Sequence, residues 1–171
     1  QPCSLPTSPT PAAPTANLIG CAFEHLLTVM AEVFALRGRS ALVVRGFDGL
    51  DEITMTGPTR VLRVAQGRIG QDEIAPGDFG MATCGIEELR GGDGRHNAGV
   101  ARELIAGREG PVRDAVLLNS AAALVAFDGL DPGADLVSAM RSAVDRAAEA
   151  IDAGEAGRLL DRWASFSATR H

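Results

Sequence analysis

The 171-residue sequence has no lysine and no tyrosine, and its three cysteines form no C-x-x-C pair. Such cysteine usage argues against a disulfide framework or a zinc ribbon and favours a reducing compartment. No apolar run approaches the roughly 18 residues of a membrane helix, and the chain opens with no signal-peptide pattern. The 22 acidic residues outnumber the 16 basic ones, all arginine, which argues against nucleic-acid binding. We therefore expect a cytoplasmic protein that binds neither membranes nor nucleic acid.

Apolar residues make up 46% of the chain, which is enough for a hydrophobic core. The length predicts a single domain. Residues 1–15 contain five of the nine prolines, a density typical of an extended tail or linker. We expect residues 16–171 to form the folded part. Because the first residue is Gln1 and not Met, we also expect the chain to be a fragment of something longer.

The first folded segments have the pattern of a strand, a helix and a second strand. Short apolar runs at residues 17–21 and 41–45 predict two buried strands. Between them, apolar residues at three- and four-residue spacing predict a helix over 24–37 that ends at Gly38. This unit implies neighbouring parallel strands with a right-handed crossover.

The rest of the chain predicts one hairpin followed by helices. Residues 58–74 flank the turn dipeptide Gln66-Gly67, which indicates two antiparallel strands. Asp93 is a suitable N-cap for one helix and Pro111 a suitable start for the next, and two amphipathic stripes follow them. We therefore expect an α/β fold: a partial, mostly parallel sheet with flanking helices and one antiparallel hairpin. So small a sheet would leave apolar helix faces without partners.

One acidic loop is the first candidate for chemistry. The sequence Gly-Phe-Asp-Gly-Leu-Asp-Glu directly follows the second predicted strand and ends in Asp51 and Glu52. Ligands of open α/β sheets bind beyond the carboxyl ends of the strands. Mg²⁺ is commonly held by one or two carboxylates, with water and phosphate oxygens completing its shell. The pair is therefore a candidate metal site, and the alternative is a solvated acidic loop.

Other polar positions favour structural roles. The turn Gly91–Gly94 could bind phosphate at a helix N-terminus, but a glycine turn capped by Asp93 is the favoured interpretation. Arg113 and Asn119 lie on a predicted buried helix, where they are expected to form a polar network that satisfies buried backbone groups. Ser120 lies in no nucleophile-elbow motif. We identify no catalytic residue from these patterns.

Several longer motifs, in one order and at one spacing, resemble the C-terminal half of anthranilate phosphoribosyltransferases of the actinobacterial type. They are PAAPTANLIGCAFE at 11–24, ALVVRGFDGLDEI at 41–53, TGPT at 56–59, DFG at 78–80, LRGGDGRHNA at 89–98 and GPVRDAVLLNSAAAL at 110–124. The GLDE and GPxRDAVLLNxAAAL runs together are specific. The resemblance covers about 160 residues of the chain and differs at Arg45, where the family often has histidine.

This resemblance implies the C-terminal part of a phosphoribosyltransferase/nucleoside phosphorylase-like α/β catalytic domain. The family transfers the phosphoribosyl group of PRPP to anthranilate in tryptophan biosynthesis, and it forms homodimers. Its GLDE acidic pair binds Mg²⁺, and this pair corresponds to Asp51 and Glu52. The family's glycine-rich diphosphate loop and its anthranilate segment are not in this chain, which implies a truncated form. The alternatives are a non-catalytic remnant, a complementing subunit of the same fold or, more distantly, a pyrimidine nucleoside phosphorylase.

Overall fold

The computed structural model describes residue 14 and residues 16–169. The predicted proline-rich tail at 1–15 therefore lies, except for residue 14, outside the described residues. In chain order the elements are β1 (Ala16–Gly20), α1 (Glu24–Leu36), β2 (Ser40–Gly46), β3 (Thr59–Ala65), β4 (Arg68–Ile74), the short 3-10 helices η1 (Pro76–Phe79) and η2 (Ile86–Leu89), α2 (Gly94–Ile105), α3 (Pro111–Asp128), α4 (Leu136–Asp152) and α5 (Glu155–Ala168).

The predicted strand–helix–strand unit is confirmed. Strands β1 and β2 are parallel neighbours, with Leu18 opposite Leu42, and α1 connects them. Side chains alternate between the two faces of β2. Val43 packs against α1 on one face, and Leu42 packs against α3 and α4 on the other. Because both faces of β2 are covered, residues 41–44 form a continuous buried run, as is usual for a strand between two helical layers.

The described sheet has fewer parallel pairs than the sequence predicted. Its order is β1-β2-β3-β4, and only the β1–β2 pair is parallel. A parallel strand needs a long crossover connection, usually a helix. The connection at 47–58 contains no helix and returns the chain at the same end of the sheet, so that Gly46 lies opposite Thr59. Strand β3 is therefore antiparallel to β2.

The predicted hairpin is confirmed as β3 and β4, which are joined by Gln66 and Gly67. Both turn residues have positive φ angles, 52° for Gln66 and 72° for Gly67. A two-residue turn with positive φ at both positions matches the right-handed twist of the paired strands.

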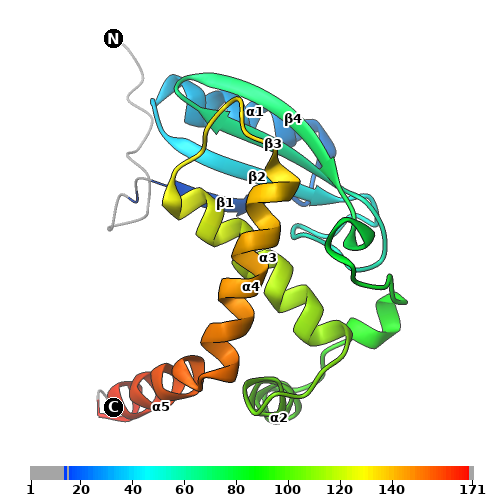
Figure 1. Ribbon diagram of the computed structural model, residues 1–171, viewed down its shortest axis with the longest axis vertical. Helices are drawn as coiled ribbons and strands as arrows, with labels where there is room; N and C mark the ends of the chain where they lie inside the picture. Colours follow the sequence, from blue (N-terminus) through cyan, green and yellow to red (C-terminus); the bar gives the residue numbers. More distant parts are fainter. Residues whose placement is uncertain (1–13, 15, 170–171) are drawn as a thin grey trace.

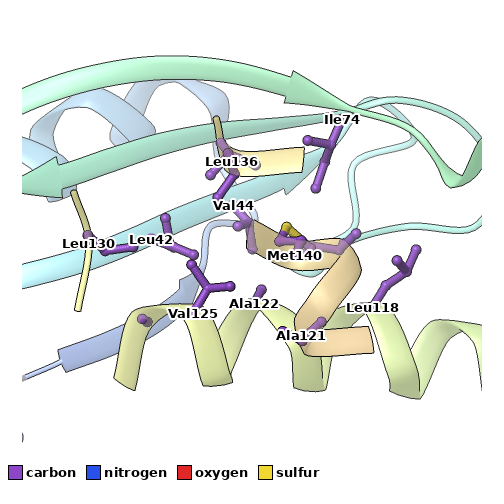
Figure 2. Close-up of a cluster of buried hydrophobic side chains, with 14 of the residues drawn as sticks. Leu42, Val44, Ile74, Leu118, Ala121, Ala122, Val125, Leu130, Leu136 and Met140 are labelled. Atoms are coloured by element: carbon purple, nitrogen blue, oxygen red, sulfur yellow. The ribbon is translucent and has the colours of Figure 1, made fainter. Parts of the chain in front are cut away.

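Helices α3 and α4 cover the sheet face opposite α1 and form the main core with it (Figure 1). Figure 2 shows Ala122 and Val125 of α3 below Leu42 of β2, with Met140 of α4 packed beside them. Two predicted helix starts are confirmed. The side chain of Asp93 caps α2, and α3 begins at Pro111.

Helices α2 and α5 lie at the end of the molecule opposite the sheet, at the bottom of Figure 1. The described part of α5 has no buried residue, and Trp163 on it is 69% exposed. Phe127 near the end of α3 is 80% exposed. Apolar helix faces without partners were predicted from the sequence. In the part of the chain that the structure describes, no helix is both long enough and apolar enough to span a membrane.

Candidate functional site

The acidic pair lies in the connection at 47–58, between β2 and β3. Because β1 and β2 are parallel, their carboxyl ends, Gly20 and Gly46, lie at the same edge of the sheet. Asp51 and Glu52 are both exposed and belong to no helix or strand. The structure therefore places the predicted pair in an exposed loop at the carboxyl edge of the sheet, and the metal-binding role stays a prediction.

The loop packs directly against the end of β1. A Cβ atom added at Gly20 would lie 1.6 Å from the carbonyl oxygen of Asp51. No other amino acid fits at that position unless the loop moves. The absence of a side chain at Gly20 thus allows the backbone at Asp51 to lie directly against the end of β1.

Asp48 is hydrogen bonded to three other residues of the same loop. Its Oδ2 accepts hydrogen bonds from the hydroxyls of Thr54 and Thr56, both at 2.5 Å, and its Oδ1 accepts one from the N–H of Leu50 at 3.0 Å. Partial desolvation raises the pKa of Asp48, but the hydrogen bonds from Thr54, Thr56 and the backbone outweigh it and leave the pKa below its ordinary value. The carboxylate form of Asp48 is therefore stabilised.

Asn119 connects the same loop to α3. Its Oδ1 accepts a hydrogen bond from the N–H of Ile53 at 3.0 Å, and its Nδ2 donates to the carbonyl oxygens of Ile53 and Ala115, both at 2.9 Å. Ile53 is only 2% exposed, so its backbone groups depend on protein partners. The favoured interpretation of Asn119 as part of a polar network for buried backbone is confirmed, and its partner is the residue that follows the acidic pair.

Arg45, at the end of β2, braces two loops through their carbonyl groups. Its Nη1 donates to the carbonyl oxygens of Cys21 and Gly49, each at 3.1 Å, and also to that of Ala22. The acceptors lie after β1 and within the acidic loop. From the sequence, Arg45 stands out only as a difference from the family pattern, because a lone arginine at a strand end carries no signal for its partners.

The electrostatics of the pair suit a divalent cation. Desolvation raises the pKa of Glu52, and the negative charges of Asp51 and then Asp48 raise it further. A bound cation would offset this repulsion. Among residue 14 and residues 16–169, no group of three or more His, Cys, Asp or Glu side chains is arranged to hold a metal ion. Asp51 and Glu52 supply only two carboxylates, so a Mg²⁺ ion held by them would have to take its remaining ligands from water or a bound phosphate group.

The Gly91–Gly94 turn serves as a helix start. Oδ1 of Asp93 accepts a hydrogen bond from the N–H of His96 at 2.8 Å, and the N–H of Gly92 donates to Oδ1 of Asn97, also at 2.8 Å. The Gly92 N–H is therefore already engaged, which favours the predicted glycine turn with an aspartate cap over a phosphate nest. Arg113 was expected to satisfy buried backbone groups, but its Nη2 donates instead to the side-chain carboxylate of Asp152 on α4, at 2.8 and 2.9 Å.

A cavity of about 1340 Å³ lies between α2, α3 and α4, and none of residues 46–59 lines it. Its walls are mostly apolar helix side chains, such as Val100, Leu104 and Leu124. The cavity is therefore separate from the acidic loop that carries Asp51 and Glu52 and the hydrogen bonds of Asp48. Size alone does not make it the site of chemistry.

Residues 7–157 match the family described as glycosyl transferase family, a/b domain. The chain is 55% identical over 163 residues to an anthranilate phosphoribosyltransferase of Nocardia farcinica, and the match covers 93% of this chain and 47% of that protein. A second anthranilate phosphoribosyltransferase, from Rhodococcus jostii, is 53% identical over 157 residues, and the match covers 92% of this chain and 43% of that protein. The chain thus spans less than half the length of these curated relatives.

Solved structures agree on the fold. An anthranilate phosphoribosyltransferase from Thermus thermophilus is similar with a TM-score of 0.71 and 32% identity, over 86% of this chain and 41% of that one. The anthranilate phosphoribosyltransferase of Saccharomyces cerevisiae, solved in complex with PRPP and Mg, has a TM-score of 0.73 and 22% identity. The match covers 85% of this chain and 40% of the yeast chain. The resemblance predicted from the motifs is confirmed: the chain belongs to the glycosyl transferase family with this a/b domain and is similar, over most of its length, to actinobacterial anthranilate phosphoribosyltransferases.

Proposed function

We propose that residues 16–171 are the C-terminal portion of the catalytic α/β domain of an anthranilate phosphoribosyltransferase. In this proposal Asp51 and Glu52 bind Mg²⁺ that accompanies the diphosphate of PRPP. The observation that carries it is the position of two exposed carboxylates at the carboxyl edge of the sheet, in a loop anchored by Asn119. The names of the relatives at 55% and 53% identity support the choice of reaction.

The reaction requires a leaving group of high negative charge. The bond between the anomeric carbon of ribose and a diphosphate oxygen breaks, and its electron pair leaves with diphosphate. The amino nitrogen of anthranilate forms the new bond to that carbon and loses a proton. Bound Mg²⁺ supplies positive charge that stabilises the departing diphosphate. The role of this chain is to hold that charge in place with Asp51 and Glu52, at the edge of the sheet where ligands of α/β folds bind.

The proposal assigns only part of the site to this chain. The structure assigns no described residue to proton transfer or to the seating of anthranilate. The chain spans 47% of the Nocardia relative, so we propose that full activity needs polypeptide equivalent to the rest of that relative. The yeast enzyme of similar fold, solved with PRPP and Mg, supports both as ligands of the complete protein. The homodimer implied by the resemblance and the cytoplasmic location expected from the sequence belong to the same proposal.

Complementation tests this proposal. This chain would be produced together with the part of the Nocardia relative that it does not match, in a bacterial strain whose own anthranilate phosphoribosyltransferase gene is deleted. We expect growth without tryptophan for the wild-type pair and none when Asp51→Ala and Glu52→Ala are combined. The matched control is Asp131→Ala, which removes an exposed carboxylate far along the chain. Failure of the wild-type pair to restore growth, with both polypeptides folded and associated, would favour the non-catalytic remnant.

A further inference from the structure

Asp48 is hydrogen bonded on both sides of the acidic pair. Leu50, which donates its N–H to Oδ1, precedes Asp51 and Glu52, and Thr54 and Thr56, which donate their hydroxyls to Oδ2, follow them. A single carboxylate therefore draws together the two ends of the segment that carries the pair.

The network requires a carboxylate in particular. Oδ2 of Asp48 accepts two hydroxyl groups, and the Thr54 hydroxyl oxygen itself accepts the N–H of Thr56 at 3.0 Å. Thr54 is 1% exposed. Hydrogen bonds to an ionised acceptor are shorter and stronger than those between neutral groups. An asparagine at position 48 would place a donor NH₂ group or a single neutral oxygen against two hydroxyls, so at least one hydrogen bond would be weakened or lost.

We infer that Asp48 is a positioning residue for the Asp51–Glu52 pair: it holds residues 48–56 in the shape that presents the two carboxylates together, and it is not itself a metal ligand. Both oxygens of Asp48 are already engaged by this loop. The part of the inference that concerns metal rests on the proposed function. The part that concerns loop shape rests only on the hydrogen bonds of Asp48.

Amide hydrogen exchange of the full chain, measured by NMR, tests loop shape without any ligand. In Asp48→Asn we expect the amides of Leu50 and Thr56 to exchange about tenfold faster, the effect of losing a charged hydrogen bond. The matched control is Asp131→Asn. Oδ1 of Asp131 accepts the N–H of Gly133 at 2.9 Å, two residues ahead, as Oδ1 of Asp48 does for Leu50. Asp131→Asn should leave the Leu50 and Thr56 amides unchanged, and unchanged exchange in Asp48→Asn as well would overturn the inference.

Two conservative variants of Thr56 distinguish the effect of its hydroxyl from the effect of its side-chain shape. Thr56→Val keeps the branched shape and removes the hydroxyl that donates to Asp48, whereas Thr56→Ser keeps the hydroxyl. We expect faster exchange of the Leu50 amide in Thr56→Val and near wild-type exchange in Thr56→Ser. Equal exchange in the two variants would overturn the role of this hydrogen bond.

A second readout connects loop shape to metal binding. Mn²⁺, which takes oxygen ligands as Mg²⁺ does, would be added with inorganic diphosphate, and paramagnetic broadening of the Asp51 and Glu52 amide signals would be titrated. We expect several-fold weaker affinity in Asp48→Asn and wild-type affinity in Asp131→Asn. Unchanged affinity in Asp48→Asn would overturn the positioning role alone. Absence of broadening in the wild-type chain would overturn metal binding by the Asp51–Glu52 pair in this chain, and with it the role of Asp48 toward the metal.

Discussion

The side-chain amide of Asn119 holds both the N–H and the carbonyl oxygen of Ile53, at 3.0 and 2.9 Å. Ile53 immediately follows the acidic pair, and Asn119 lies in the middle of α3. Through this contact the position of the loop depends on the helix that packs under the sheet. The loop is thus anchored to the core at its buried end and presents Asp51 and Glu52 at its exposed end.

Asn119→Ala should destabilise the fold. The variant leaves the backbone N–H and carbonyl of buried Ile53 without their partner, which costs about 1–3 kcal/mol per unsatisfied group. Urea unfolding followed by circular dichroism measures the change. Asn97→Ala removes an exposed asparagine that bonds Gly92 and should cost less. Equal losses in the two variants would show that Ile53 finds other partners.

Gly20→Ala should displace the acidic loop. A Cβ at position 20 would lie 1.6 Å from the Asp51 carbonyl oxygen, so either the strand end or the loop must move, at a cost of about 1–3 kcal/mol as for other overpacked sites. Gly57→Ala is the control in the same loop, because a Cβ there meets nothing within 4 Å. Thermal unfolding and the amide chemical shifts of residues 50–53 would reveal both effects. A Gly20→Ala chain that matches Gly57→Ala would contradict the close approach.

The double variant Asp51→Ala and Glu52→Ala should keep the fold and lose function. Both side chains are exposed, and surface changes of this kind usually alter stability by less than about 0.5 kcal/mol. In the complemented enzyme we expect turnover to fall by orders of magnitude, because the Mg²⁺ that accompanies the diphosphate would lose its carboxylate ligands. Unchanged Mg²⁺-dependent turnover would refute the assignment of the pair.

The stabilising effect of Asp48 should depend on pH. Its pKa is lowered in the folded chain, so the unfolded chain takes up a proton first as the pH falls. The contribution of Asp48 is therefore complete above the pKa of the unfolded state and is lost as the pH falls through the lower folded pKa. The difference in unfolding free energy between wild type and Asp48→Asn should be largest near neutral pH and shrink in acid. Urea unfolding from about pH 7 to about pH 3 measures it, and a constant difference would contradict the assigned shift.

The chain alone, residues 1–171, should transfer no measurable phosphoribose to anthranilate. Two substrates must be held in register, and such positioning can contribute about 7–11 kcal/mol to catalysis. In the proposed function the two carboxylates of this chain would reach diphosphate only through metal ions, and Mg²⁺ binds weakly without phosphate oxygens around it. Anthranilate fluorescence in the presence of PRPP and Mg²⁺ provides the assay. Steady product formation above a no-protein control would show that this chain carries a complete site.

Several elements could be predicted from short stretches of sequence because their causes are local. The hairpin turn at Gln66 and Gly67 and the N-cap Asp93 are decided by residues next to one another in the chain. The acidic pair was found in the same way, from a motif that follows a strand. Asp48 was missed as an anchor, because its donors Thr54 and Thr56 are ordinary loop residues whose orientation no periodic pattern reports.

Apolar periodicity and turn chemistry act over a few residues, so the amino-acid order is enough to predict the strand–helix–strand unit, the hairpin, the helix starts and the position of Asp51 and Glu52 after β2. The antiparallel return of β3 to β2, and the hydrogen bonds between Asn119 and Ile53, 66 residues apart, depend instead on long-range packing. An asparagine on a helix can bond to any backbone group within reach. Its partner is selected by how α3 packs under the sheet, and that packing depends on the whole core rather than on any local run of residues.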